Sequence, residues 1–286
     1  MRNDNVALLQ LCSGANVKHN LAQIEQQIKP LSDTVKLVLT PENALLFADV
    51  ESYREHAEVQ GTGPLQQAVS EMAQRYGIWL LIGSMPLISR EDPSRITNSS
   101  LLFDDQGEIR ARYDKIHMFD VDINDEHGPY NESAIYQRGE HITVVDTPVG
   151  RLGMTICYDL RFPGIFQALR EQGAELISVP AAFTRLTGKS HWEPLLKARA
   201  IENQCIILAP AQVGVHGTCR TWGHTMAVSG WGEIIKKNPL TVSALPLNIR
   251  RDSLILIREQ IKVVKHNRFR PQLTSLIKKN TNQGKE

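Results

Sequence analysis

Short apolar runs of strand-forming residues alternate along this chain with longer stretches whose apolar residues recur at helical spacing. The runs end at prolines, glycines or polar turns, which limits them to the length of strands. Strands are predicted at 6–11, 34–39, 78–82 (ending at Gly83), 142–146, 151–156, 176–179, 205–209, 224–229 and 233–237, with a hairpin at 101–113. Helices are predicted at 17–31, 65–76, 163–172, 190–202 and 250–261, and a long loop at 117–140. This alternation predicts an α/β fold in which helices cover a sheet.

The composition is that of one folded unit without a strong charge. The 286 residues are 42% apolar, and 32 basic residues balance 31 acidic ones to a formal net charge of +1. No sharp change in composition divides the chain, so we expect a single domain over 1–270 and a polar C-terminal tail over 271–286. The charge balance provides no field for binding nucleic acid or an anionic membrane. No apolar run approaches the roughly 20 residues of a membrane span, and the N-terminus is too short and polar for a signal peptide.

The cysteines and histidines show no pattern of a metal site. Cys12, Cys157, Cys205 and Cys219 are widely spaced and form no CxxC pair, which is typical of reduced thiols in a cytoplasmic protein. No cluster of His, Cys and Asp has the spacing of zinc ligands. The glycines at 61–64 lack the lysine and the spacing of a phosphate-binding loop. We therefore expect no metal and no cofactor.

Three reactive side chains follow predicted strand ends. Cys157 follows the strand at 151–156, Glu42 follows Pro41 after the strand at 34–39, and Lys115 follows the hairpin. Taken singly, each residue has an ordinary structural interpretation. A cysteine on an apolar strand is by default a small buried hydrophobic residue, and glutamate and lysine are mostly exposed. Their function therefore depends on whether the three residues occur together in a known pattern.

The three segments that contain these residues, taken in order, resemble the signatures of the nitrilase superfamily of carbon–nitrogen hydrolases. They are Pro41–Asn43, Tyr113–His117 and Cys157–Pro163. The segments Ala198–Asn203 and Trp222–Thr225 also resemble family elements, so the resemblance extends over about residues 5–268. It implies a four-layer αββα sandwich and an assembly into homodimers or larger homo-oligomers.

The resemblance also implies roles for four residues. Cys157 would be the nucleophile that forms a thioester, and Glu42 would be the base that moves protons. Lys115 would stabilise the oxyanion, with the backbone N–H of Tyr158 as a second donor. Glu132 lies in the loop after the lysine and resembles a second family glutamate, which would hold Lys115 in place. The alternative for Glu132 is a carboxylate at the surface of the loop.

Within the superfamily, the segment from Cys157 to Pro163 is most similar to the Nit branch, which includes ω-amidases and amidases of deaminated glutathione. The resemblance therefore implies a cysteine-dependent amidase that acts on a small ω-amide. Tyr158, Phe183 and Thr184 are candidate substrate-binding residues, because the ends of strands in α/β sheets border ligand crevices. Two alternatives stay open: a nitrilase or N-carbamoyl amino acid hydrolase, and a catalytically silent member that acts as an interaction scaffold.

Overall fold

A computed structural model describes residues 5–123 and 129–273 of the chain. Its first sheet has six strands in the order β16-β1-β2-β3-β4-β5. These are β16 (Ala244–Leu247), β1 (Val6–Leu9), β2 (Leu37–Leu39), β3 (Trp79–Ile88), β4 (Ile96–Phe103) and β5 (Ile109–Asp114). The pairs β1–β2 and β2–β3 are parallel, and the other pairs of this sheet are antiparallel.

The second sheet also has six strands, in the order β15-β14-β11-β10-β9-β8. These are β15 (Ile234–Asn238), β14 (Thr225–Val228), β11 (Ile206–Ala209), β10 (Leu176–Ser178), β9 (Gly150–Met154) and β8 (Thr143–Thr147). Its central strands β9, β10 and β11 are parallel, as β1, β2 and β3 are in the first sheet. Each sheet therefore has three parallel strands whose carboxyl ends lie on one edge.

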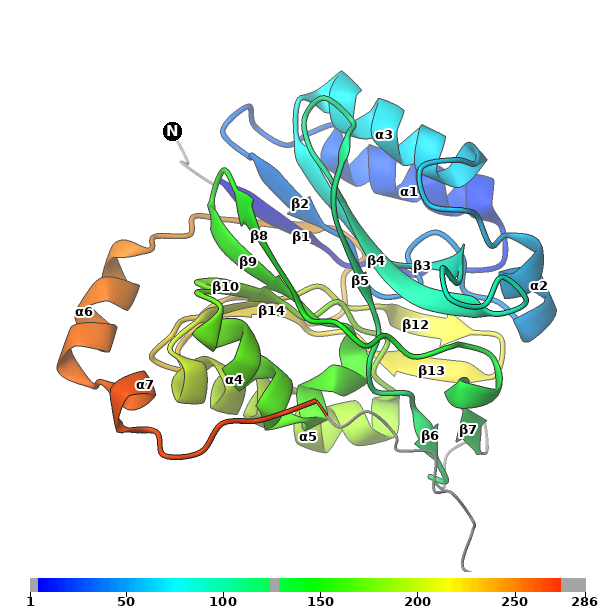
Figure 1. Ribbon diagram of the computed structural model, residues 1–286. Helices are drawn as coiled ribbons and strands as arrows, with labels where there is room; N and C mark the ends of the chain where they lie inside the picture. Colours follow the sequence, from blue (N-terminus) through cyan, green and yellow to red (C-terminus); the bar gives the residue numbers. More distant parts are fainter. Residues whose placement is uncertain (1–4, 124–128, 274–286) are drawn as a thin grey trace, which may run out of the picture.

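Helices cover the outer face of each sheet (Figure 1). Helices α1 (Val17–Ile28) and α3 (Pro64–Tyr76) lie over the first sheet, and α4 (Pro163–Glu171) and α5 (Arg185–Asn203) lie over the second. The order of layers is thus helices, sheet, sheet, helices, which is the predicted αββα sandwich. Shorter elements complete the described chain: α2 (Val50–Glu55), α6 (Asp252–Gln260), α7 (Val263–His266), the 3₁₀ turns η1 (Glu132–Ala134) and η2 (Cys157–Arg161), and the strand pairs β6 (Asp120–Val121) with β7 (Tyr130–Asn131) and β12 (Val213–His216) with β13 (Cys219–Trp222).

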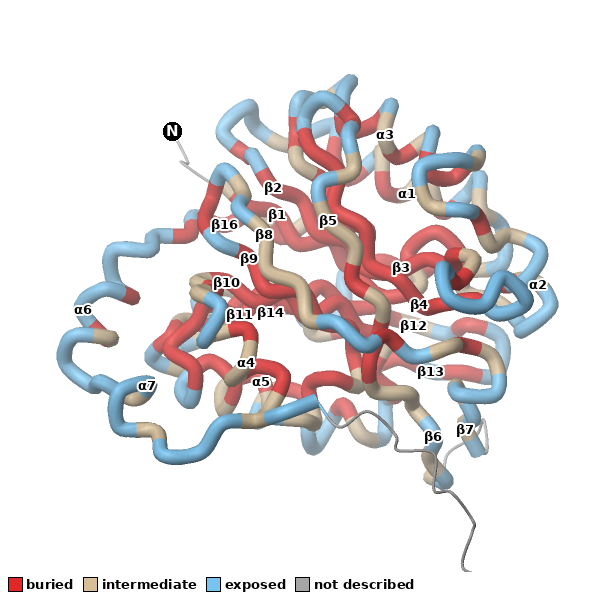
Figure 2. The backbone as a smooth tube through the Cα atoms, in the orientation of Figure 1, coloured by how far each residue is buried: buried red, intermediate tan, exposed pale blue. Residues whose placement is uncertain are grey.

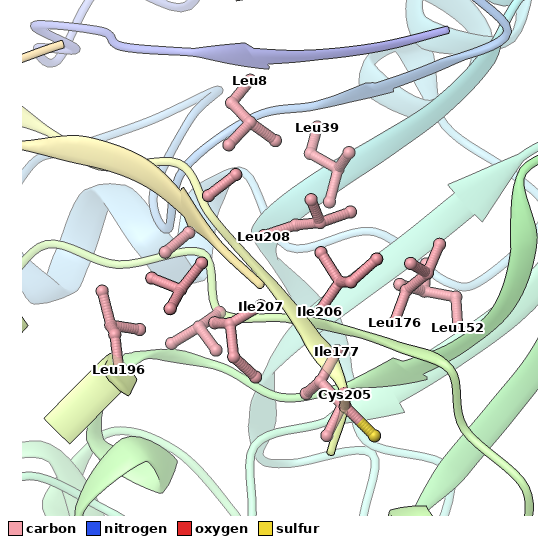
Figure 3. Close-up of a cluster of buried hydrophobic side chains, with 14 of the residues drawn as sticks. Leu8, Leu39, Leu152, Leu176, Ile177, Leu196, Cys205, Ile206, Ile207 and Leu208 are labelled. Atoms are coloured by element: carbon pink, nitrogen blue, oxygen red, sulfur yellow. The ribbon is translucent and has the colours of Figure 1, made fainter. Parts of the chain in front are cut away.

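Alternating side chains along each strand fill two apolar layers. Leu8 and Leu39 of the first sheet face Leu176, Ile206 and Leu208 of the second (Figure 3). The residues between them, such as Ala7, Leu9 and Val38, pack against Ile24 of α1 and Val69 of α3. The central strands of both sheets are therefore buried on both faces, as Figure 2 shows, which explains why β1, β2, β10 and β11 are almost continuously apolar. Full burial of one leucine side chain contributes about 1.5–3 kcal/mol to stability.

Two predicted boundaries are wrong for identifiable reasons. The strand that we ended at Gly83 continues to Ile88 through a change of register between Ile82 and Met85. A Cβ at Gly83 would lie 2.3 Å from the carbonyl oxygens of Thr40 and Pro41, so this glycine permits a close approach between chains instead of ending the strand. The helix predicted from 190 begins at Arg185, because Thr184 accepts a hydrogen bond from the Thr187 N–H as its N-cap.

Several elements were not predicted, and part of the prediction lies outside the described residues. Helix α2, strand β16 and the β12–β13 pair were not predicted from the sequence. The loop predicted at 117–140 contains β6, β7 and η1, and its residues 124–128 lie outside the described residues. Most of the predicted tail, 274–286, also lies outside them. None of the helices within 5–123 and 129–273 has the length and apolar character needed to cross a membrane.

Candidate active site

The loops that follow β2 and β10 meet where the carboxyl ends of the two sheets face each other. Glu42 lies three residues beyond β2, and its Oε2 accepts a hydrogen bond of 3.0 Å from the N–H of Ala182, which follows β10. Glu42 is only 5% exposed. The Glu42 carboxylate, which follows a strand of the first sheet, is therefore held by a backbone N–H that follows a strand of the second sheet. This contact forms only where the two sheets meet.

Lys115 follows the last residue of β5 and lies between two carboxylates. Its Nζ is 2.8 Å from Glu42 Oε1 and 2.9 Å from both oxygens of Glu132. Burial opposes the positive charge of Lys115, but Glu132 and Glu42 outweigh that effect, and its pKa is raised well above the ordinary value. The lysine is only 2% exposed and stays an ammonium, so it supplies a fixed positive charge inside the protein.

Glu132 and Asn98 complete this cluster of charges. The Nδ2 of Asn98, on β4, donates to Glu42 Oε1 at 3.3 Å and to Glu132 Oε1 at 3.2 Å. The Phe119 N–H donates to Glu132 Oε2 at 2.7 Å. Burial raises the pKa of Glu132, against the opposing effect of the Lys115 charge. The structure thus places Glu132 beside Lys115, whereas Asn98 was not found from the sequence because it lies within a strand without a recognisable motif.

Cys157 is the first residue of η2 and has a left-handed backbone with a φ of 44°. This conformation is uncommon for a residue with a side chain and costs of the order of 1–3 kcal/mol. The Cys157 N–H donates to the Pro180 carbonyl at 2.9 Å, and the thiol lies beside the Glu42 carboxylate, close enough for that carboxylate to affect its ionisation. Burial, followed by the charge of Glu42, raises the pKa of the thiol well above its ordinary value. At rest, Cys157 is therefore a neutral thiol beside a carboxylate that can accept its proton.

A second buried carboxylate, Asp159, joins the cysteine turn to the lysine loop. Its Oδ2 accepts from the Tyr113 hydroxyl at 2.7 Å and from the Ile156 N–H at 2.8 Å. Its Oδ1 lies 2.7 Å from His117 Nδ1 and accepts from the His117 N–H at 3.2 Å. Asp159 is fully buried. The tyrosine and histidine of the lysine motif therefore hold the cysteine turn in place.

A cavity of about 400 Å³ opens over Cys157, Glu42 and Lys115. Tyr158, Phe183 and Thr184 all line it, as does Arg161. The Arg161 guanidinium lies over the rings of Tyr158 and Phe183, 5.8 Å and 5.2 Å from their centres. The other wall was not predicted from the sequence, because it comes from α2, η1 and β13 and the loops beside them; it includes Phe47, Tyr53, Tyr130, Tyr136 and Cys219.

Within residues 5–123 and 129–273, no group of three or more His, Cys, Asp and Glu side chains is placed to hold a metal ion. The groups that surround the thiol are instead one ammonium, two carboxylates and one amide. This set can donate to an oxyanion and can accept and return a proton, which are the requirements of acyl transfer through a cysteine.

Comparison with known proteins agrees with this chemistry. The carbon-nitrogen hydrolase family profile matches residues 5–249. The chain is 70% identical over 270 residues to a deaminated glutathione amidase of Yersinia enterocolitica, with 94% of each chain covered. The structure of Saccharomyces cerevisiae Nit3, a member of branch 10 of the nitrilase superfamily, matches with a TM-score of 0.81 and 27% identity, over 92% of this chain and 96% of Nit3. The NitFhit protein of Caenorhabditis elegans also matches with a TM-score of 0.81, at 32% identity, over 94% of this chain and 66% of NitFhit. The chain therefore belongs to the carbon-nitrogen hydrolase family of the nitrilase superfamily, as its motifs predicted.

Proposed function

We propose that this chain hydrolyses the amide bond of a small ω-amide, with deaminated glutathione as the first candidate, through a thioester on Cys157. Membership of the family makes the chain a hydrolase of carbon–nitrogen bonds other than peptide bonds. The observation that carries the proposal is the contact of one buried thiol with Glu42, whose carboxylate also binds Lys115. The relative of 70% identity, a deaminated glutathione amidase, supports the choice of substrate.

Acylation follows from the contacts of the thiol. Glu42 takes the thiol proton while the sulfur attacks the amide carbon, and the carbonyl oxygen becomes an oxyanion. The Nζ of Lys115 and the N–H of Tyr158 are the donors for that oxyanion, since N–H groups in the first turn of a helix such as η2 have no partner within the helix. The carbon–nitrogen bond then breaks, and Glu42 returns the proton to the departing amine or ammonia, which leaves a thioester.

Deacylation repeats these steps with water. Glu42 takes a proton from a water molecule while the oxygen of that water attacks the thioester carbon. The carbon–sulfur bond then breaks, and Glu42 returns the proton to the sulfur of Cys157. Through both halves of the reaction Lys115 must keep its position, although one of its two carboxylate partners gains and loses a proton. Glu132 accepts hydrogen bonds from Lys115 through both oxygens and is suited to this task. We assign it the role of a positioning residue.

The cavity suits a substrate that carries a carboxylate at a distance from the reacting amide. Arg161 lines the cavity, and its Nη1 lies 3.1 Å from His191 Nδ1. No ion pair joins Arg161 to an acidic residue of the described chain, so its charge is available to a ligand. Tyr158 and Phe183 hold the guanidinium from two sides, and we assign them, with Thr184, to the substrate-binding wall. Thr184 acts there through the position of α5, because its hydroxyl caps that helix.

Two measurements test this function. Mass spectrometry after brief exposure to deaminated glutathione and other ω-amides is expected to find the acyl group on Cys157. Cys157→Ala is expected to abolish turnover with the fold retained, whereas Cys205→Ala, a matched change of another buried thiol, leaves turnover largely intact. Equal losses in the two variants contradict the assignment of the nucleophile. Faster turnover of nitriles or N-carbamoyl amino acids than of amides contradicts the choice of reaction.

The chain also carries features that support a homodimer or larger homo-oligomer. Large apolar side chains are exposed on α5, on the turn between β14 and β15, and on α6; they include Ile201 at 53%, Trp231 at 53% and Leu256 at 60% exposure. Large exposed apolar surface commonly marks an interface between proteins. Light scattering is expected to give at least twice the 32.1 kDa mass of the chain, and a monomeric mass contradicts this part of the proposal.

We further propose a cytoplasmic location and a single domain over 1–270 followed by a tail over 271–286. All four cysteines are free thiols, and thiols without disulfides are typical of a reducing compartment. Both sheets share one apolar layer, which supports a single folding unit. Truncation after residue 270 is expected to leave the thermal unfolding temperature unchanged, and a large decrease contradicts this boundary.

A further inference from the structure

A second cavity lies at the opposite end of the strand that leads to Cys157. Its volume is about 360 Å³, and its wall includes Arg151, Arg170, Arg251 and Arg258. Gly150 and Arg151 begin β9, which runs from this cavity towards the nucleophile turn. Arg170 lies in the last turn of α4, the helix that begins just after that turn. The cavity therefore lies at the far ends of the strand and the helix that flank the turn of Cys157, and it shares no lining residue with the active-site cavity.

Positive charge is in excess in this cavity. Four arginines line it together with only two carboxylates, Asp146 and Glu175, which leaves two guanidinium charges uncompensated. One carboxylate is already engaged: Glu175 Oε2 accepts from Arg251 Nη1 at 2.9 Å and from the Arg151 N–H at 3.0 Å. The other, Asp146, is 87% exposed and lies 3.9 Å from Arg151 Nε, where the attraction is weak.

Arg258 is held by neutral groups. Its Nη2 donates to the carbonyls of Ala174 and Gln204 at 3.0 Å and 2.9 Å, and its Nε donates to the second of these at 3.2 Å. The nearby Cys205 does not balance the charge, because burial raises its pKa to about 11, against the effect of Arg258, and it stays a neutral thiol. The guanidinium of Arg258 is thus fixed in place with its charge only partly compensated.

Arg170 has no partner of its own among the described residues. Its Nε is buried and forms no hydrogen bond with any of them, and none of their carboxylates forms an ion pair with it. Arg170 and Arg258 line the same cavity, and burial, followed by the charge of Arg258, lowers the pKa of Arg170. A buried N–H without a partner is costly, as are two like charges at one site. An anion bound in the cavity removes the repulsion between the two guanidiniums.

We propose that this arginine cavity binds a phosphate group, either as inorganic phosphate or as the terminal group of a small phosphate monoester. The charge of a phosphate dianion equals the excess in the cavity. Its oxygens suit the planar donor forks of arginine, which bind phosphate through paired hydrogen bonds. The site is independent of the amide chemistry, since none of its residues contacts Cys157, Glu42 or Lys115.

Isothermal titration calorimetry of the full chain tests the proposal, with inorganic phosphate at mildly alkaline pH and constant ionic strength. We expect one phosphate to bind per chain, and Arg170→Gln to weaken binding roughly tenfold or more, the cost of one hydrogen bond to a charged group. Arg75→Gln is the matched control. It removes the same charge from α3, which covers the first sheet, where Arg75 does not line the arginine cavity. Glycerol phosphate in a parallel titration distinguishes the sources: tighter binding than phosphate indicates a monoester, and weaker binding indicates the free ion.

Three results overturn the proposal: no binding of either phosphate compound, equal affinity in Arg170→Gln and the unchanged chain, or binding of succinate in place of phosphate. Arg151→Gln is the second variant for the same titration. The Arg151 side chain makes only the 3.9 Å contact with Asp146, so the loss of its charge should not disturb the fold. Arg170→Gln is expected to retain full amide turnover. Loss of phosphate binding with turnover intact thus separates this site from the proposed catalytic function.

Discussion

Replacement of Asp159 by asparagine tests whether the buried carboxylate holds the nucleophile turn. The change keeps the size of the side chain but replaces one oxygen by an NH₂ group, which donates where the carboxylate accepts. In the unchanged chain, each carboxylate oxygen of Asp159 accepts two hydrogen bonds. Oδ2 accepts from Tyr113 and Ile156, and Oδ1 accepts from the ring and the backbone N–H of His117. In either orientation, the NH₂ group of the asparagine would therefore face two groups that now donate to a carboxylate oxygen, in a site from which water is excluded.

The magnitude follows from the number of contacts. The Tyr113 hydroxyl can rotate to accept from the new amide, but a backbone N–H cannot, so at least one bond to a charged acceptor is lost and one donor is left unpaired. Each of these costs about 1–3 kcal/mol, and we expect the free energy of unfolding to fall by about 3–5 kcal/mol. Displacement of Cys157 by about 1 Å would lower kcat by roughly a hundredfold.

Urea unfolding and steady-state kinetics measure the two effects. Tyr113→Phe is the matched control, since it removes one donor to the same carboxylate and leaves the others; its expected cost is about 1–2 kcal/mol. An Asp159→Asn variant whose free energy of unfolding lies within about 1 kcal/mol of the unchanged chain would refute the reasoning. So would a Tyr113→Phe variant that loses more stability than Asp159→Asn.

Three further predictions concern the charges of the site. Glu132→Gln is expected to lower kcat by about tenfold or more, because Lys115 loses a charged acceptor, whereas the same change at the exposed Glu140 leaves kcat unaltered in steady-state assays. Because folding raises the pKa of Cys157, the thiol's contribution to stability is complete below its ordinary pKa of 9.0 and is lost as the pH rises above it. Thermal unfolding should therefore show the stability of the unchanged chain falling relative to Cys157→Ala above pH 9.0, and a constant difference contradicts the raised pKa. Arg161→Gln is expected to raise KM for ω-amides that carry a distant carboxylate and to leave KM for neutral amides unchanged; an equal rise for both contradicts a charge-based role.

The sequence was sufficient to pick out four candidate residues, because each lies in a short segment that resembles a family signature. Glu42, Lys115, Glu132 and Cys157 were identified with their neighbours, and the structure brings all four together around one cavity. The α/β class could likewise be predicted from the alternation of short apolar runs with amphipathic helices, whereas the four αββα layers were implied only by the family resemblance. These features depend on local pattern, which a single sequence displays directly.

The rest of the cavity could not be predicted, because its residues are defined only by packing. Asn98 resembles any polar residue of a strand until the first sheet places it between two carboxylates. Tyr53 and Cys219 belong to α2 and β13, short elements without a clear period or turn signal. Gly83 was read as a stop for the same reason: the close approach of the Thr40 and Pro41 carbonyls appears only in three dimensions.

The nucleophile turn illustrates how motif and packing depend on each other. The left-handed backbone at Cys157 is held by the Pro180 carbonyl, and the turn that follows it by the guanidinium of Arg199, whose Nε donates to the Leu160 carbonyl at 3.0 Å. Arg199 comes from α5 and Pro180 from the end of β10, so both contacts form only when the second sheet and its helix are assembled. The strain of the turn, of the order of 1–3 kcal/mol, is then offset by bonds that are absent from the unfolded chain. A peptide with the same motif therefore has no reason to present its thiol in this way, and the conformation of Cys157 is a property of the assembled sandwich.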